Sequence, residues 1–409
     1  MDHPLDIAEA ADCDVGGLPR WETALARLLA AATVLEPEEI PLEAAAGRVL
    51  AAPVIAPRNR PARDLSAMDG YAIAGSAPEP GAELPIIGRA WAGRPFAGRL
   101  AKGHAVRITT GAPMPSGAER VIVDEAVSVE GSLVRITRPS GEKRHVRPIG
   151  SDFRAGDVLV AAATRLTPPA LMAAAAAEAS RVLVRQEPRL AILAVGDELA
   201  RDERCGDDAI PDSASPGVGA LAQTWGAQVV GRQRCSDDAN DLAAAVGELL
   251  EGCDLLAVIG GASGSERDLT RAAAAKAGAG PLFAGVSIKP GKPAWAASTG
   301  ARLVVGLPGN PVAALVAARL LLVPTLVKMT GRDPSAALAW RRAPTTANLG
   351  ATGERETLVL AEAVGGSVTP LDRQESASHA QLARLTALIR RRAASAPAAA
   401  DELVDYLDL

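Results

Sequence analysis

Residues 302–322 read RLVVGLPGNPVAALVAARLLL, and this stretch decides the fold. It begins with an apolar run of strand length and ends with an apolar run of helix length. Between the two runs, Asn310 suits a helix N-cap and Pro311 suits the first helical position. The stretch therefore predicts a buried strand, a tight LPGNP loop and a helix. Amides at the start of that helix would suit an anion, and the alternative is an ordinary helix start.

The same alternation extends backwards from this stretch to about residue 186. Three further apolar strands each precede a helical pattern: RLAILAV (189–195), AQVVGRQ (227–233) and DLLAVIG (254–260). Nearly continuous apolar strands that alternate with helices predict a parallel sheet covered by helices on both faces. Ligands of such sheets bind beyond the carboxyl ends of the strands, which here are the loops GDEL, GGASGSERD and LPGNP.

Acidic residues follow several of these strands. Asp197 and Glu198 follow the first, Asp237 and Asp238 follow the second, and Asp268 ends the glycine-rich loop after the third. Each acid alone is most simply a solvated loop residue. Three strand ends of one sheet that carry acids predict a site for a divalent cation such as Mg²⁺.

Two lysines lie three residues apart in a turn rich in proline and glycine. Lys289 and Lys292 belong to the six lysines of the chain, and the alternative for them is a solvated loop. Together with the backbone of Gly260 and Gly261 and with Ser263, they would suit a phosphate-bearing ligand. The glycine-rich loop is neither a dinucleotide fingerprint nor a P-loop.

Composition sets further bounds. The 409 residues predict two to four domains, and the formal charge of -5 implies no general attraction to nucleic acid or to an anionic membrane. The four cysteines form no CxxC pair, which favours free thiols in a reducing compartment. The N-terminus lacks an apolar signal core, and Arg319 and Pro324 interrupt the longest apolar run. We expect a cytoplasmic protein.

The remaining segments differ from the α/β part in their residue pattern. Residues 56–148 contain short Val/Ile runs between Gly and Pro, which predict a β-rich module. In it, Asp69 and Thr110 lie in turns of small residues, and ordinary turn formation is the alternative to a site there. Helical patterns are expected at Trp21 to Val34 and after Pro168. Residues 331–409 predict two strands, then a helix, then a last acidic strand.

Seven motifs follow one another along the chain: SAMDGYA (66–72), RITTGAPMPSGAERVIVDEA (107–126), GSDFRAGD (150–157), AVGDEL (194–199), GGASGSERD (260–268), IKPGKP (288–293) and LPGNPVAAL (307–315). Their order resembles that of molybdopterin molybdenumtransferases, the family that includes the C-terminal domain of gephyrin. The chain resembles this family from about Trp21 to Asp333, and weakly to its end.

The resemblance implies an α/β multidomain protein. It implies an elongated helical domain (1–55 plus 149–185), an inserted β-rich domain (56–148), a three-layer α/β molybdopterin-binding domain (186–330) and a small β-rich C-terminal domain (331–409). It also implies an elongated homodimer whose cleft lies between the α/β domain of one subunit and the β-rich module of the other. Other proteins of molybdenum-cofactor synthesis and apo-molybdoenzymes are further implied partners.

The reaction implied by the resemblance takes adenylylated molybdopterin and molybdate, requires Mg²⁺ and releases AMP. The residues that match functional positions of the family are Asp69, Thr110, Asp152, Glu198, Asp237, Asp268, Lys289 and the loop of Pro308, Gly309 and Asn310. We assign Glu198, Asp237 and Asp268 to the metal. Lys289 and the glycine-rich loop are assigned to the phosphates.

The chain also departs from the family pattern. Val195 replaces a Thr, Ile259 a Ser or Thr, Ala214 an Asn and Gly285 a basic residue, and the tail motifs are reduced to RQESAS and LTALI. These losses favour an alternative, a divergent paralogue that binds molybdopterin or its partner proteins as a carrier or scaffold. Hydrolysis of another nucleotide by a related α/β domain is a third interpretation.

Overall fold

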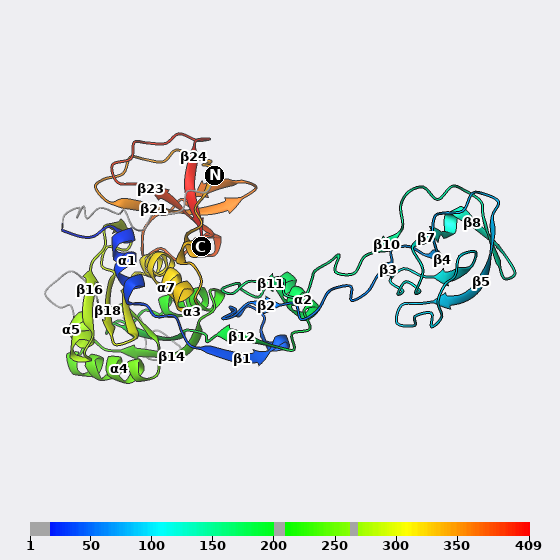
Figure 1. Cartoon of the computed structure of the whole chain (residues 1–409). Coiled ribbons are helices and arrows are strands. Elements are labelled where there is room, and N and C mark those ends of the chain that lie inside the picture. Colours follow the sequence, from blue (N-terminus) through cyan, green and yellow to red (C-terminus); the bar gives the residue numbers. More distant parts are fainter. Residues whose placement is uncertain (1–16, 200–208, 262–268) are drawn as a thin grey trace.

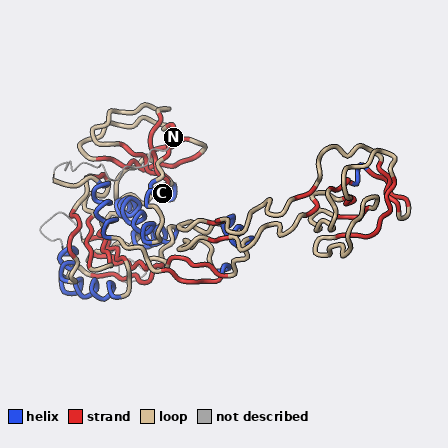
Figure 2. The backbone as a smooth tube through the Cα atoms, in the orientation of Figure 1, coloured by secondary structure: helices blue, strands red, loops and turns tan. Residues whose placement is uncertain are grey.

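The structure is a computed structural model that describes residues 17–199, 209–261 and 269–409. The molecule is elongated: the α/β domain and the C-terminal domain lie at one end, and the β-rich module lies at the other (Figure 1). A narrow stalk joins them, and the chain passes along it in both directions (Figure 2). The expected multidomain α/β architecture is confirmed.

The α/β domain is built on a six-stranded sheet. Its order is β14 (Gln228–Cys235), β13 (Arg189–Val195), β15 (Leu255–Gly260), β19 (Arg302–Leu307), β18 (Trp295–Thr299) and β16 (Gly280–Ala284). The first four strands are parallel, as predicted, and β18 and β16 add an antiparallel edge.

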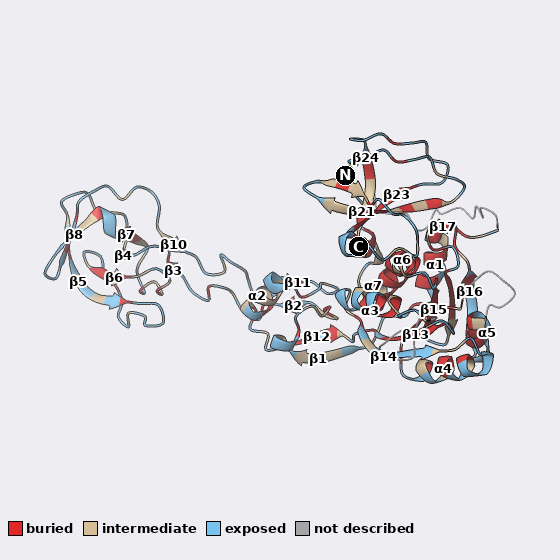
Figure 3. Cartoon of the chain, turned by 180° about the vertical axis from the view of Figure 1, so that it is seen from behind, coloured by how far each residue is buried: buried red, intermediate tan, exposed pale blue. Residues whose placement is uncertain are grey.

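Helices cover both faces of this sheet. One face packs on α1 (Trp21–Ala31), α3 (Ala214–Thr224), α6 (Pro311–Ala317) and α7 (Val323–Met329). The other face packs on α4 (Ala239–Glu251) and α5 (Leu269–Lys276). Buried residues are accordingly concentrated in this domain (Figure 3). The position of α1 corrects the predicted boundary, because its apolar face joins the α/β core and not the stalk.

The longest helical run is continuous from α6 to α7. A π-helical turn, η3 (Ala318–Leu322), precedes Pro324, whose ring cannot donate a backbone hydrogen bond. The run from Pro311 to Met329 is long and apolar enough to span a bilayer, although Arg319 and Pro324 lie in it. Within the protein, 89% of an 18-residue window of this run is buried, which is typical of a core helix.

The stalk contains more strand than helix, which corrects the expected helical domain. β1 (Pro37–Pro41) pairs with β12 (Arg181–Arg185), and β2 (Val54–Ile55) pairs with β11 (Val158–Val160). The 3₁₀ turn η1 (Leu42–Ala44) and α2 (Pro168–Ala176) complete it. In the stalk the backbone N–H and C=O groups of paired strands hydrogen-bond to each other, so most of this backbone is paired without forming helices.

The β-rich module holds a six-stranded sheet, as its short Val/Ile runs predict. The order is β7 (Arg120–Val123), β4 (Gly70–Ile73), β6 (Ala105–Ile108), β5 (Glu83–Ala90), β9 (Leu133–Ile136) and β8 (Val127–Glu130). The 3₁₀ turn η2 (Asp124–Ala126) links two of these strands, and β3 (Leu65–Ser66) pairs with β10 (Val146–Arg147) at the base.

The C-terminal domain is a third mixed sheet. Its members are β17 (Ile288–Lys289), β21 (Glu356–Val364), β22 (Ser367–Pro370), β23 (Ala387–Arg391), β24 (Leu403–Asp408) and β20 (Arg341–Pro344), with 3₁₀ turns η4 (Pro334–Leu338) and η5 (Leu382–Arg384). β17 belongs to the chain of the α/β domain and crosses into this sheet. The predicted helix is wrong, because pairing with β21 and β24 makes 387–391 a strand despite its helix-favouring Leu, Ala and Arg.

Candidate functional site at the strand ends of the α/β domain

Two acidic loops meet at the carboxyl edge of the sheet. β13 and β14 are neighbouring parallel strands, so their following loops leave the sheet side by side. The Asp237 amide donates to Asp197 Oδ1 at 3.1 Å, and the Asp197 amide donates to Asp237 Oδ2 at 3.4 Å. The predicted juxtaposition of acids from these two strand ends is therefore present.

Glu198 belongs to the same cluster. A Cβ atom on Gly196 would lie only 2.5 Å from Glu198 Oε2, so this carboxylate folds back over the loop that holds Asp197. Asp238 has a different role, because it is the N-cap of α4 and accepts from the amides of Asn240 and Asp241. These two backbone hydrogen bonds lower the pKa of Asp238.

Glycines allow the loops after β15 and β19 to approach each other. Gly260 has φ +91, and a Cβ on it would lie 2.3 Å from the carbonyl oxygen of Val195. Gly261 has φ +62, and a Cβ on it would lie 2.5 Å from Thr270 Cγ2. A Cβ on Gly309 would lie 3.4 Å from Gly260 Cα. Close packing of the chain on itself thus requires Gly260 and Gly261, whether or not a phosphate also approaches them, while Gly309 makes an ordinary contact.

The start of α6 is covered by the C-terminal domain. The Val312 amide donates to the Ser376 carbonyl at 3.2 Å, and Asn310 Nδ2 donates to Ser376 Oγ at 3.1 Å. Nearby, Ser213 Oγ lies 2.8 Å from His379 Nε2 at the start of α3. One amide of this helix start therefore has a partner in the chain, and binding of an anion by Pro308, Gly309 and Asn310 stays a prediction.

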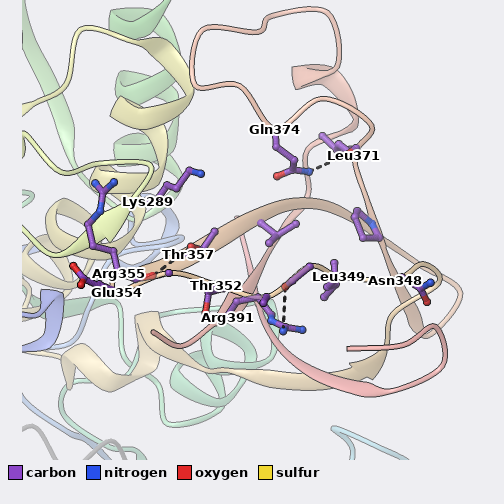
Figure 4. Close-up of a pocket in the computed structure, with 15 residues that line it drawn as sticks. Lys289, Asn348, Leu349, Thr352, Glu354, Arg355, Thr357, Leu371, Gln374 and Arg391 are labelled. Atoms are coloured by element: carbon purple, nitrogen blue, oxygen red, sulfur yellow. Dashed lines mark hydrogen bonds between the residues drawn. The ribbon is translucent and has the colours of Figure 1, made fainter. Parts of the chain in front are cut away.

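Lys289 faces the C-terminal domain. It is exposed at the end of β17 and is the register partner of Thr357 in β21. It lines a pocket of about 600 Å³ whose other polar walls include Arg355, Gln374 and Arg391 (Figure 4). Among the described residues that line this pocket, none comes from the two acidic loops. Lys292 lies in the turn that follows β17, where its carbonyl accepts from the Val286 amide.

Asp69 and Thr110 lie together in the distant β-rich module. The Thr110 amide donates to Asp69 Oδ1 at 2.6 Å, and Thr110 Oγ1 donates to the same oxygen at 2.9 Å. These hydrogen bonds, first the backbone one and then the hydroxyl one, lower the pKa of Asp69. Asp152 lies in the stalk, with its Oδ2 3.4 Å from Arg147 Nη2.

The donor set of the acidic loops suits Mg²⁺. Magnesium in proteins is commonly held by one or two carboxylates together with water and substrate phosphates. Asp197 and Asp237 each place one carboxylate oxygen on the backbone amide of the other. Across residues 17–199, 209–261 and 269–409 no group of three or more metal-ligating side chains forms. Ser263 and Asp268, which were also predicted for the site, lie outside these ranges.

Comparison with known proteins decides the family. Residues 20–177 match the MoeA N-terminal region (domain I and II), and residues 191–328 match the probable molybdopterin binding domain. The molybdopterin molybdenumtransferase of Haemophilus influenzae is 32% identical over 309 residues, which cover 75% of this chain and 75% of that protein. The Nostoc protein of the same name is 31% identical over 331 residues, 79% of this chain and 76% of that one.

This chain belongs to the molybdopterin molybdenumtransferase family. The fold agrees: the crystal structure of the molybdopterin biosynthesis moeA protein from Pyrococcus horikoshii OT3 has a TM-score of 0.83. That likeness covers 96% of this chain and 100% of the other, at 23% identity. Because the sequence identity is only 23%, this structural likeness shows the fold alone.

The departures from the molybdopterin molybdenumtransferase pattern are explained by packing. Val195, Ala214 and Ile259 are 3%, 7% and 3% exposed, and their side chains lie in the hydrophobic core. The loss at Ile259 of a hydroxyl that could reach an anion predicts a ligand-facing position there. This prediction is wrong, because Ile259 packs in the core. Gly285 has φ +87, and a Cβ there would lie 2.8 Å from Leu18 Cδ2, so the local backbone itself favours glycine.

Sequence reasoning missed the contribution of the C-terminal domain. Ser376 and His379, which contact the starts of α6 and α3, lie in a polar segment that resembles any surface loop. Arg355, Gln374 and Arg391, which share the pocket with Lys289, come from three separate places in the chain. No local pattern connects such residues, because the pairing of β17 with β21 and of β21 with β23 places Lys289 and Arg391 on either side of Thr357.

Proposed function

We propose that this chain inserts molybdate into adenylylated molybdopterin and releases AMP, with Mg²⁺ as its metal. Membership in the family supports the reaction class. The observation that carries the assignment is the pair of acidic loops tied to each other at the carboxyl edge of the parallel sheet. We also propose a cytoplasmic location and, as further partners, other cofactor-synthesis proteins and apo-molybdoenzymes.

The roles of the residues follow from their chemistry. Asp237 and Asp197, with Glu198 and Asp268, would hold the cation, which when bound supplies positive charge to the phosphate oxygens of the substrate. The fixed carboxylates orient it because the backbone amides of the opposite loop hold them in place. Lys289, from the pocket beside the C-terminal domain, is a second cation for an anionic ligand.

A homodimer is part of the proposal. In one chain the acidic loops and the Asp69–Thr110 pair lie at opposite ends of the molecule (Figure 1). The stalk also exposes apolar side chains: Ile55 and Val158 are register partners that are 52% and 56% exposed, and Met172 on α2 is 75% exposed. A second copy that covers this face would remove apolar surface from water and bring the module of one subunit towards the α/β domain of the other.

The reaction is tested by the release of AMP from adenylylated molybdopterin in the presence of molybdate and Mg²⁺. Asp237→Asn should reduce the rate about a hundredfold or more, because the amide keeps the hydrogen-bond acceptor but lacks the charge. Glu248→Gln, an exposed carboxylate on α4, is the matched control and should keep the parent rate. Equal rates in Asp237→Asn and the parent would contradict the site.

The composite cleft is tested by complementation. Mixed dimers of an Asp69→Asn chain and a Glu198→Gln chain should regain activity, since one of their two clefts contains neither substitution. Light scattering should give twice the mass of the chain. A monomer, or no recovery after subunit exchange has been verified, would exclude the dimer while leaving the reaction to be judged by AMP release.

A further inference from the structure

A second pocket lies where the stalk meets the β-rich module. Its volume is about 370 Å³, and its walls come from residues 57–63, from Arg147 and Phe153, and from the end of α2. Four of the lining residues are arginines: Arg58, Arg60, Arg63 and Arg147. The only acid among the described residues that line it is Glu178.

The positive charge of this pocket is only partly balanced. Arg58 forms an ion pair with Glu178, and Arg147 lies 3.4 Å from Asp152. Within the described part of the chain, the guanidinium groups of Arg60 and Arg63 have neither an ion-pair nor a hydrogen-bond partner. Two unpaired arginines in one concavity raise the local positive potential, although the net charge of the whole chain is -5.

The wall that presents these arginines is fixed by the backbone. The Arg60 amide donates to the Phe153 carbonyl at 2.8 Å, and the Arg60 carbonyl accepts from the Asp152 amide at 3.0 Å. The Gly150 amide donates to the Pro61 carbonyl at 3.0 Å, and the Ala155 amide donates to Asn59 Oδ1 at 2.9 Å. An anion would therefore meet a site whose backbone is already in place, which lowers the entropy lost on binding.

We propose that this pocket binds the phosphate or diphosphate group of a small molecule. Planar guanidinium groups donate in pairs to phosphate oxygens, and a hollow of this volume suits a phosphorylated small molecule. The pocket is made by a single chain and lies apart from the strand ends of its α/β domain. Arg147 in this pocket contacts Asp152, one of the residues that match functional positions of the family, so the inference deepens the proposed function and rests on it, while its test by phosphate binding is separate from AMP release.

Calorimetric titration of the full chain with sodium pyrophosphate, and separately with inorganic phosphate, tests the proposal. We expect the Arg60→Gln/Arg63→Gln double variant to bind about tenfold or more weakly than the parent, the size of a lost charge-assisted hydrogen bond. Tighter binding of pyrophosphate than of phosphate would identify a diphosphate site, and the reverse a monophosphate site.

Three further variants make the test specific. Arg99→Gln, an exposed arginine of the module outside the pocket, should bind pyrophosphate like the parent. Lys289→Gln, which changes the other pocket, should leave pyrophosphate binding by the stalk pocket unchanged. Arg63→Lys keeps the positive charge but loses the paired donors of the guanidinium group, so this variant should also bind pyrophosphate more weakly than the parent. It tests the proposal if the double variant does not fold. Absence of pyrophosphate binding by the parent, or equal affinity in the folded double variant, would overturn the proposal whatever the AMP assay shows.

Discussion

Arg390 joins the first helix to the C-terminal domain, and replacing it by Met should strongly destabilise that junction. The residue lies on β23 and is 9% exposed. Its Nε lies 2.8 Å from Glu356 Oε1, and its Nη2 donates to Glu356 Oε2 at 3.0 Å and to Glu22 of α1. The guanidinium carbon also lies 5.4 Å from the ring centre of Trp21 and 5.1 Å from that of Trp340.

The magnitude follows from what the substitution leaves behind. The side chains of Glu22 and Glu356 are 12% and 7% exposed, so Arg390→Met leaves the buried Glu356 carboxylate without its cation. Glu22 keeps only the more exposed Arg20, whose Nε lies 3.8 Å from Glu22 Oε2. Removing one partner of a buried ion pair costs about 3–5 kcal/mol, because the remaining charge is uncompensated. We expect the free energy of unfolding of this region to fall by that amount at neutral pH.

Urea unfolding followed by tryptophan fluorescence measures this loss, since Trp21 and Trp340 report on the junction directly. Adding Glu22→Gln and Glu356→Gln to the Arg390→Met chain should recover stability, because neutral amides leave no unpaired charge. The control Arg342→Met breaks an exposed pair with Asp405, whose side chains are 65% and 43% exposed, and should cost at most about 1 kcal/mol.

Two results would refute this reasoning. The first is an Arg390→Met chain as stable as the Arg342→Met control. The second is an unchanged stability when the two glutamates are neutralised in the Arg390→Met background. Either would mean that water reaches the carboxylates and that the junction is held by the two indoles alone.

The remaining predictions concern single sites. Gly306→Ala should destabilise the fold by about 1–3 kcal/mol in a denaturant titration, because its Cβ would lie 1.9 Å from a buried indole nitrogen. Gly247→Ala, with open space in α4, should instead stabilise it by about 1 kcal/mol. The stabilising effect of ionised Asp69 is present above the ordinary carboxyl pKa and is lost as pH falls through its lowered value. Thr110→Val should therefore raise the pKa of Asp69 in an NMR titration, while an unchanged value would exclude the hydroxyl as a cause. Gly285→Lys and Gly285→Ala should lower the free energy of unfolding equally, by about 1–2 kcal/mol in thermal unfolding, because the positive φ at this position disfavours any side chain. Tighter substrate binding by the Lys variant alone would show instead that a positive charge at this position matters.

The α/β domain could be predicted because its signals are local. Each strand is a short apolar run, each following helix has its own periodicity, and both are visible within about 30 residues. The acidic loops could be placed together for the same reason: the carboxyl ends of parallel strands must lie on one edge of the sheet. Asp197 and Asp237 are 40 positions apart, and the backbone amide of each still donates to the carboxylate of the other.

Signals that depend on distant partners gave wrong or incomplete predictions. Residues 387–391 contain helix-favouring types, but β21 and β24 offer their backbone groups a sheet, and pairing overrides a weak propensity. Trp21–Ala31 shows the period of a helix and nothing about where it packs. The start of α6 looked open to an anion because Ser376, which occupies one of its amides, is 64 positions away from Val312.

The sequence by itself determined the family, the alternation of strands and helices, and the edge of the sheet at which the acids gather. Tertiary structure alone decided that Lys289 faces a pocket of the C-terminal domain, that Ile259 is a core residue, and that the Asp69–Thr110 pair lies far from the acidic loops of its own chain. The physical reason is range: hydrophobic period and turn chemistry act between neighbours in the chain. The direction in which a loop side chain points depends on the segments that pack against it, and the chain brings these together only when it folds.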